Sequence, residues 1–406
     1  MRKFIYIIIS AVLFATSCEK VQPNGENAKL PIFRGYMQFS TGVSTRAQLV
    51  TSMKGKSFGV IGYQYSNTSF WDWSKSITAP STFYNQRVNC DANGVCTYDY
   101  ENSSASYGDN PKQWDDYRYA FFAYHPYGGS GISLSSQSET NTPTITYGYG
   151  WQNETGTINL CSENIPNFDL MTAEAVDVNG SGTGRVPLDF KHRMFALEIL
   201  ANNYNENTYE YIVDGNDDYV LDAQGNKQFL LDNEGNKIIA ESAQQQITNL
   251  TLTLNGLTNT SMVIPLSMRA GEDDPVYTKG NIGERKFKIS DETVIIPAFN
   301  ETTDDGRGEG VATSISHMGS VNGGYLFLIP QEGSDSGITG TLDWEELENF
   351  QQANGNEGVN TEFNSTMEFK PGKLYQVYIN FVGSGITITL IEAGNWDVLD
   401  VTHTFE

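Results

Sequence analysis

Two cysteines flank a short segment whose sequence predicts a tight turn. Cys90 and Cys96 enclose Asp-Ala-Asn-Gly-Val, and the Asn93-Gly94 pair is a strong short-range signal for a β-hairpin. Such a turn would bring the two thiols together, so we expect a local disulfide between Cys90 and Cys96. A loop this short would contribute only about 2 kcal/mol. The spacing does not match a zinc site, and Cys161 is expected to be a buried free thiol.

The histidines and carboxylates form no pattern typical of an enzyme. The four histidines, His125, His192, His317 and His403, are outside metal-ligand spacing of one another and of any cysteine. The chain has no nucleophile elbow, no H-E-x-x-H pair and no phosphate-binding loop. Acidic residues are plentiful, but a sequence does not give the separation in space that a glycosidase pair requires. We therefore expect no enzyme, no catalytic residue, no metal site and no cofactor.

Aromatic residues are the remaining candidates for ligand binding. Trp71 and Trp73 would lie on one face of an extended segment, and Trp114 adds a further indole. A row of rings can stack on sugars, but aromatic side chains also contribute much of the burial energy inside a β-sandwich. The sequence favours the packing interpretation and leaves the ligand interpretation open.

The N-terminal segment predicts export. Arg2 and Lys3 precede an apolar run from Phe4 to Ala15, which is too short for a stable membrane anchor and fits a signal peptide. Small residues then lead to Cys18. Cleavage before Cys18 and acylation of that residue would give an outer-membrane lipoprotein, and the segment resembles the looser lipobox of Bacteroidetes lipoproteins. Ordinary secretion is the alternative.

The net charge restricts the partners. The formal charge of −24 becomes −26 when Arg2 and Lys3 are removed with the signal peptide. Such an acidic surface repels nucleic acids and anionic lipid head groups. We expect no nucleic-acid partner.

Short runs with strand character recur along the chain. Many alternate apolar with Thr or Asn residues, as at Ile247–Leu257 and Ile386–Ile391, which predicts strands with one buried face. The Gly- and Ser-rich stretch Asn179–Gly184 divides about seven such runs from about seven more, so it indicates a domain boundary. The predicted strands are Ile32–Phe39, Ser57–Tyr65, Thr82–Val88, Val95–Tyr100, Tyr117–Tyr124, Thr144–Tyr149, Asp169–Val178, Val186–Leu200, Ile247–Leu257, Met262–Met268, Thr293–Phe299, Tyr325–Pro330, Glu368–Phe381 and Ile386–Ile391. Leu342–Gln352 is the best candidate for a short helix.

One segment repeats itself. Tyr219–Lys227 and Phe229–Lys237 share the pattern Leu-Asp-x-x-Gly-Asn-Lys, and Tyr211–Asn216 is a partial copy. Each copy predicts a short strand followed by an Asx or Gly turn, so we expect a β-meander that decorates the fold. Asp214, Asn216 and Asp218 alternate as in a calcium loop, but the central Gly and the terminal Glu of an EF-hand are missing, and turn chemistry explains these residues.

A series of short motifs is distributed over most of the chain. They are the lipobox at Cys18, Ser44–Ala47, Tyr119–Pro126, Phe168–Ala173, Val186–Met194, Phe369–Tyr375 and Trp396. In their order and spacing, the chain resembles the fimbrillin (Mfa-like) family of Bacteroidales type V pili, and Val186–Met194 is the most family-like stretch.

The resemblance implies an all-β fold with two tandem transthyretin-like antiparallel β-sandwich domains. The implied parts are a lipoprotein signal peptide (1–17), an N-terminal propeptide with the first strand (18–46), an N-terminal β-sandwich (47–184) and a C-terminal β-sandwich (185–406). The last part would include a donor-type C-terminal strand.

The resemblance also implies assembly by strand exchange. An arginine-specific protease would cut between Arg46 and Ala47, which removes the first strand and leaves an apolar groove with unpaired backbone groups. The C-terminus of another subunit would fill that groove, with Leu399, Val401, His403 and Phe405 alternating with polar residues. The alternatives are that Arg46 is a loop residue without a role and that the C-terminal residues complete their own sheet.

Three functions are therefore under consideration. The first is a structural subunit, in the stalk or at the tip, of a cell-surface fimbria, with other fimbrial subunits as partners. The second is a lipid-anchored protein that is never cut and holds a pilus base or acts as an adhesin for a host or glycan ligand. The third is a surface glycan-binding lipoprotein that is unrelated to pili.

Overall fold

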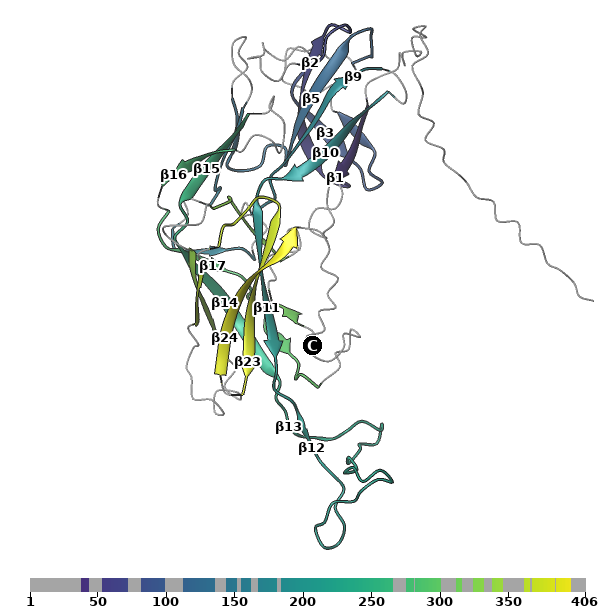
Figure 1. Cartoon of the computed structure of the whole chain (residues 1–406), viewed down its shortest axis with the longest axis vertical. Helices are drawn as coiled ribbons and strands as arrows, with labels where there is room; N and C mark the ends of the chain where they lie inside the picture. Colours follow the sequence, from purple (N-terminus) through teal and green to yellow (C-terminus); the bar gives the residue numbers. More distant parts are fainter. Residues whose placement is uncertain are drawn as a thin grey trace, which may run out of the picture. The chain divides into compact units, whose positions relative to one another are not determined.

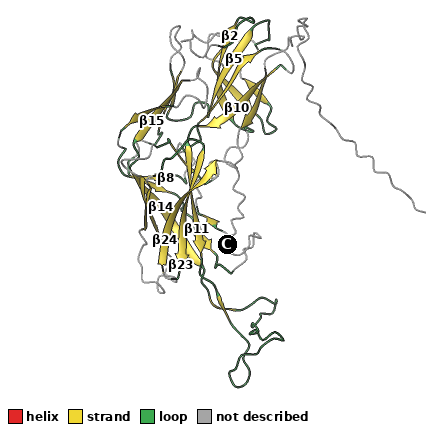
Figure 2. Cartoon of the chain, viewed as in Figure 1, coloured by secondary structure: helices red, strands yellow, loops and turns green. Residues whose placement is uncertain are grey.

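The computed structural model shows an all-β protein (Figure 2), which confirms the predicted fold class. The described residues are 38–43, 53–71, 82–98, 112–135, 144–151, 155–161, 167–180, 184–265, 275–280, 282–300, 312–315, 324–331, 338–345, 361–365, 367–383 and 385–395. All of them belong to one compact unit, Ile32–Glu406. Within these ranges, no helix has the length and apolar character needed to span a membrane.

Seven strands close into a barrel (Figure 1). Around the barrel the order is β1-β10-β9-β5-β2-β3-β4, and β1 closes it by pairing with both β10 and β4. Their bounds are β1 Gln38–Val43, β2 Ser57–Tyr65, β3 Phe83–Cys90, β4 Cys96–Tyr98, β5 Arg118–His125, β9 Met171–Val178 and β10 Arg185–His192.

The apolar run in β5 follows from its central position. Phe121 and its neighbours at every second residue face the barrel core, where they meet Phe58 and Phe190. The intervening residues, Phe122 among them, join a second cluster with Trp71. A strand that is buried on both faces needs apolar residues without alternation.

A second core lies between two further sheets. Leu252 and Leu254 of one sheet share this core with Val377 and Ile379 of the other, which is a β-sandwich arrangement. One sheet has the order β19-β11-β23-β24, with β20 paired to β11; the other has the order β22-β21-β14-β17-β8, with β18 paired to β14. Their bounds are β8 Thr157–Asn159, β11 Phe195–Asn203, β14 Gln245–Asn255, β17 Arg285–Lys288, β18 Val294–Ile296, β19 Thr313–Ser314, β20 Leu326–Leu328, β21 Ile338–Glu345, β22 Thr361–Ser365, β23 Lys373–Val382 and β24 Gly385–Asn395.

Two smaller sheets complete the fold. One has the order β16-β15-β7-β6, and the other pairs β12 with β13. Their bounds are β6 Ile132–Leu134, β7 Thr144–Gly148, β12 Thr208–Tyr209, β13 Ile239–Glu241, β15 Asn259–Pro265 and β16 Val276–Lys279.

The structure corrects the predicted helix. Leu342–Glu345 is the end of strand β21, while residues 346–352 lie outside the described residues. Ile338, Leu342 and Trp344 are buried at even spacing, so the burial follows the period of a strand.

Strand pairing does not change at the Gly-rich stretch Asn179–Gly184. The stretch connects β9 to β10, and both strands belong to the barrel. The predicted single strand Val186–Leu200 is instead divided at Arg193 and Met194 into β10, in the barrel, and β11, in the sandwich. The division into tandem domains, with its boundaries, stays a prediction.

Candidate functional site

The first strand of the barrel is held mainly from one side. All six residues of β1 pair in parallel with β10, from Gln38 opposite Arg185 to Val43 opposite Phe190. On its other side, β1 pairs with β4 only through Phe39 and Cys96. β1 is therefore the strand that closes the barrel, and β10 and β4 are the two walls between which it lies.

The wall formed by β10 has one apolar face. Val186, Leu188 and Phe190 are buried in the barrel core and alternate with exposed Arg185, Pro187 and Asp189. The ring of Phe190 packs edge-on against Phe58 with centroids 5.2 Å apart. These residues are the register partners of β1, so a strand in the position of β1 is needed to keep this part of the barrel core out of solvent.

A buried indole fixes the start of β10. Trp114 donates its Nε1 hydrogen to the carbonyl of Gly184 at 2.7 Å, immediately before the strand. The ring also packs edge-on against Tyr119 at 5.3 Å. This contact holds the β10 wall to the remainder of the barrel.

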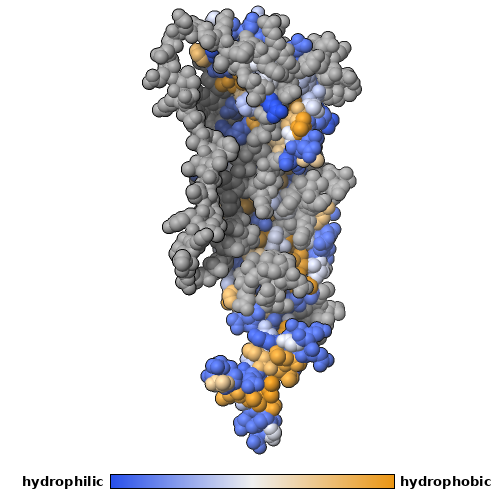
Figure 3. Space-filling model, turned by 90° about the vertical axis from the view of Figure 1, so that its right-hand side faces the viewer, coloured by the Kyte–Doolittle hydropathy of each residue, from blue (hydrophilic) through white to orange (hydrophobic). Residues whose placement is uncertain are grey.

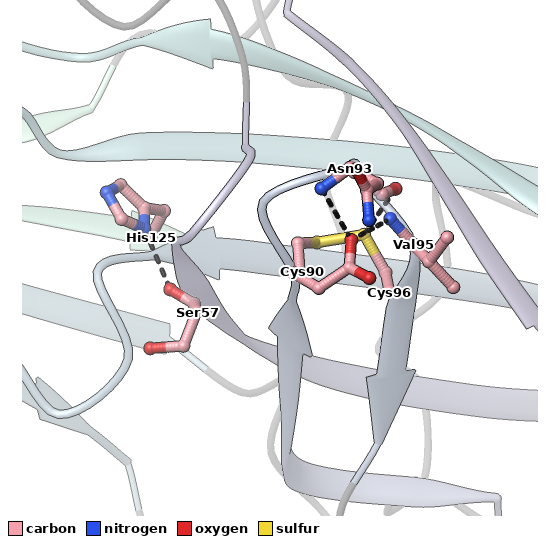
Figure 4. Close-up of a disulfide and its surroundings, with 8 residues drawn as sticks. Ser57, Cys90, Asn93, Val95, Cys96 and His125 are labelled. Atoms are coloured by element: carbon pink, nitrogen blue, oxygen red, sulfur yellow. Dashed lines mark hydrogen bonds between the residues drawn. A yellow bond between two sulfur atoms is a disulfide. The ribbon is translucent and has the colours of Figure 1, made fainter.

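The wall formed by β4 is short and is held by a covalent link (Figure 4). Cys90 on β3 and Cys96 on β4 are direct cross-strand partners, and the structure joins them in a disulfide. The turn between them contains Gly94 in the left-handed region, at φ +85°, where glycine is the favoured residue.

The carboxylate of Asp91 organises the same turn. Its Oδ1 accepts hydrogen bonds from the backbone N–H groups of Asn93 and Val95, both at 2.8 Å (Figure 4). The donor groups, with Val95 the strongest, hold the pKa of Asp91 below its usual range. The turn that positions β4 thus contains a carboxylate that stays ionised near neutral pH.

At the other end of the chain, β24 is the outermost strand of its sheet. Ile386, Ile388 and Leu390 are half-buried against the sandwich core, and the intervening Thr387 and Thr389 are exposed. The predicted donor residues follow Asn395. Leu399, Val401, His403 and Phe405 lie outside the described residues, as do Cys18, Arg46, Ala47 and Trp73.

The other predicted candidates are in packed interiors. Trp71 and Trp114 are only 9% and 3% exposed. Trp71 contacts the rings of Tyr63, Tyr65 and Phe122 at centroid distances of 5.3, 5.6 and 5.4 Å. This burial agrees with the packing interpretation that the sequence favours for both indoles, and ligand binding by them stays a prediction.

Two histidines have structural partners. The Nδ1 atom of His125 lies 2.8 Å from the carbonyl oxygen of Ser57 (Figure 4), and burial lowers the pKa of His125. The ring of His192 is hydrogen-bonded through Nδ1 to Asp169.

The described residues contain no group of three or more His, Cys, Asp or Glu side chains placed to hold a metal ion. Cys161 is a free thiol that is half-buried rather than fully buried.

The pairing of β10 with the barrel strands was not predicted from the sequence, in which Val186 and the residues after it follow a Gly-rich stretch that indicates a domain boundary. The alternation of Val186, Leu188 and Phe190, which is lost after His192, was the available signal that a separate strand ends there.

A family model described as fimbrillin-like matches residues 45–296. The chain belongs to the fimbrillin-like family. The match begins just after β1 and includes the other barrel strands and β14 to β18 of the second half. It thus covers both walls of the position that β1 occupies.

Two solved structures are similar to this chain over most of its length. A fimbrial protein of Bacteroides vulgatus ATCC 8482 superposes with a TM-score of 0.50 at 17% sequence identity, covering 88% of this chain and 99% of that one. A candidate cell adhesion protein of Bacteroides ovatus ATCC 8483 gives a TM-score of 0.46 at 14% identity, covering 90% and 99%. No curated protein matches the sequence.

Proposed function

We propose that this chain is a structural subunit of a cell-surface fimbria, in its stalk or at its tip. It is exported as a lipoprotein acylated at Cys18, cut after Arg46 by an arginine-specific protease, and polymerised by strand exchange with other fimbrial subunits. Membership in the fimbrillin-like family supports the general role. The position of β1 supports the mechanism.

One observation carries the proposal: the strand that closes the barrel lies entirely before Arg46. β1 ends at Val43, three residues upstream of that arginine. A cut after Arg46 would therefore separate all six residues that pair with β10 from the remainder of the chain. Departure of β1 would expose a row of backbone N–H and C=O groups on β10, which is a template for another strand.

The C-terminal segment has the composition that such a groove requires. Leu399, Val401 and Phe405 alternate with polar residues, as a strand with one buried face does. Each fully buried apolar side chain would contribute about 1.5–3 kcal/mol, and each ladder hydrogen bond about 1 kcal/mol. The disulfide at Cys96 would keep β4 attached to β3 while the groove is empty, so the incoming strand would meet two fixed walls.

The test is controlled cleavage of the purified precursor. Treatment with an arginine-specific protease should release the segment before Ala47 and then produce ladders of polymers on denaturing gels. The Arg46→Ala variant should stay monomeric under the same treatment, whereas the matched Arg34→Ala variant should polymerise.

Two outcomes separate the proposal from its alternatives. A precursor that stays monomeric after complete cleavage at Arg46 would contradict strand exchange. A cell-surface protein that retains acylated Cys18 and is never cut would instead be a pilus anchor or an adhesin. Removal of Leu399–Glu406 tests the donor: if polymers still form at the normal rate, this segment is not the donor strand.

A further inference from the structure

The repeated segment folds into a module closed by rings of backbone hydrogen bonds. We call residues Thr208–Glu241, between β11 and β14, the insertion module. Ile212 N–H donates to the carbonyl of Gln228, Gln228 N–H to that of Val220, and Val220 N–H to that of Ile212, each at 2.9 Å. A second ring, at 2.8–2.9 Å, joins Glu210, Ile238 and Leu230. The backbone N–H and C=O groups of these segments hydrogen-bond to one another. We therefore expect the module to bind a partner through its side chains rather than by adding a strand.

Both ends of the module are clamped to the fold. The Nδ2 atom of Asn203 donates to the carbonyl of Ala243 at 2.7 Å, and the N–H of Ala243 donates to Oδ1 of Asn207 at 2.8 Å. Asn300 accepts the N–H of Asn207 at 2.9 Å. Figure 1 shows the module leaving the ends of β11 and β14 through β12 and β13.

Acidic turns connect the strand segments of the module. In each of three turns the first Asp accepts, through Oδ1, the N–H groups two and four residues later at 2.8–3.1 Å; these are Asp214, Asp222 and Asp232. The donors hold the pKa values of Asp222 and Asp232 below their usual range, so both carboxylates are ionised near neutral pH. The module has eight carboxylates against two lysines, a formal charge of −6.

The two lysines cover the aromatic rings of the module. The Nζ atom of Lys227 lies 3.6 Å from the ring centroid of Tyr219, and that of Lys237 lies 4.1 Å from the centroid of Phe229. Tyr211 stacks on Phe229 at 5.0 Å. These cation–π contacts occupy ring faces that a sugar would need.

Apolar side chains of the module are nonetheless open to solvent. No residue of Thr208–Glu241 is buried, and none belongs to a core cluster of the described residues. Leu221 and Leu231 are 54% and 52% exposed. Other large apolar residues exposed on the module are Val213, Tyr219, Leu230 and Ile239. Figure 3 shows apolar and hydrophilic side chains intermixed on this part of the molecule. A concentration of exposed apolar residues on an acidic module marks an interaction surface.

We propose that the insertion module docks a basic polypeptide that presents aliphatic side chains. The −6 charge attracts Lys and Arg, while Leu221, Leu231 and their neighbours supply apolar contact. A second copy of this chain, at −24, and an anionic lipid surface are disfavoured by like charge. A glycan is disfavoured because the ammonium groups of Lys227 and Lys237 cover ring faces of Tyr219 and Phe229 on which a sugar would stack. The proposal goes beyond the fimbrial role and requires neither cleavage at Arg46 nor strand exchange.

The test measures binding of designed peptides to the uncleaved, purified precursor. The probe is a fluorescein-labelled peptide of six Lys-Leu repeats, compared by fluorescence anisotropy with peptides of six Glu-Leu and six Lys-Ser repeats. The Lys-Leu peptide should bind at least tenfold more tightly than either comparison peptide. Replacement of Glu210–Ala240 by Asn-Gly, which keeps the clamp at Asn207 and Ala243, should abolish that binding.

Point variants distinguish binding at the module surface from nonspecific binding of the peptide elsewhere on the protein. The double variant Leu221→Ser, Leu231→Ser should weaken binding of the Lys-Leu peptide at least tenfold. The matched pair Val382→Ser, Ile391→Ser, exposed positions on β23 and β24, should leave it unchanged.

Three results would overturn the proposal. One is undiminished binding to the chain without the module, and another is Lys-Ser or Glu-Leu binding as tight as Lys-Leu binding. The third is self-association of the precursor, seen by sedimentation, that disappears with the module, since the occupant would then be a second copy. Polymerisation assays are not involved, so failure of strand exchange would leave this test intact.

Discussion

A peptide that copies the C-terminal segment should stabilise the barrel after β1 has been removed. The starting material is a precursor that ends at Asn395, so it carries no donor segment of its own. It is folded, cut after Arg46, and separated from the released N-terminal piece. A synthetic peptide of Trp396–Glu406 is then added, and thermal unfolding is followed with and without it.

The expected size of the effect follows from the pairing of β1. Its six residues pair with β10, so about six ladder hydrogen bonds are lost at about 1 kcal/mol each. Val186, Leu188 and Phe190 would each expose about one buried CH₂ group when β1 leaves, which costs about 2.4 kcal/mol more in total. Release of six residues returns about 6 kcal/mol of conformational entropy. The net loss is about 2–3 kcal/mol. With an unfolding entropy of about 2.1 cal/mol/K for each of the 349 residues from Ala47 to Asn395, this corresponds to a fall in Tm of about 3–4 °C.

The peptide should reverse most of this loss. At a free concentration of about 100 times its Kd, it adds about 2.7 kcal/mol. A control peptide with Ser in place of Leu399, Val401 and Phe405 should add nothing, because its strand has no apolar face. If the cut protein melts at the temperature of the precursor, or if both peptides act alike, the groove argument fails.

Three further predictions concern single contacts. The double variant Cys90→Ser, Cys96→Ser should lower the free energy of unfolding in urea by about 2 kcal/mol, whereas Cys161→Ser, which breaks no disulfide, should change it little. Phe190→Ala removes a fully buried ring of the β10 wall and should cost about 3–5 kcal/mol in the same assay. Burial raises the pKa of Glu198, so its charged form opposes folding; Glu198→Gln should stabilise the protein progressively as the pH rises above about 4.3 and give no gain below it.

Each of these predictions has a distinct contradicting result. Equal urea midpoints for the disulfide variant and the wild-type chain would mean that the turn alone fixes β4. A loss below about 1 kcal/mol for Phe190→Ala would mean that the neighbouring core collapses into the space. A gain from Glu198→Gln that is the same at pH 4 and pH 7 would show that changed packing, and not the charge, is responsible.

The strand content could be predicted because alternation is a local property. Ile386, Ile388 and Leu390 recur at every second residue, so they predict strand β24 without any knowledge of the strand with which it pairs. The Asn93-Gly94 turn likewise gives the pairing of β3 with β4 within a few residues. Pairing over long distances has no such local signal. The parallel alignment of β1 with β10, far along the chain, depends on which edges remain open after the other strands have paired.

In the described part of the predicted helix Leu342–Gln352, which is Leu342–Glu345, the prediction was wrong for a related reason. Leu342, Trp344 and the acidic residues around them suit an amphipathic helix when they are considered alone. In the fold, the same residues pair with β14, from Leu252 opposite Leu342 to Thr248 opposite Glu345. Tertiary pairing therefore outweighed a weak local preference, as is common for short segments.

The groove that β1 fills and the insertion module share no packed core, so their functions should be separable. Phe190 and the other β10 residues that face β1 belong to the barrel core. The module contributes no residue to the core clusters of the described residues. Hydrogen bonds of Tyr209, Asn207 and Ala243 to one another or to Asn203 and Asn300 join its two ends to the sandwich. Phe190→Ala should therefore impair assembly and leave peptide binding by the module intact, whereas replacement of Glu210–Ala240 should do the reverse. If either change impaired both properties, the two parts would be coupled through contacts that the packing of the described residues does not contain.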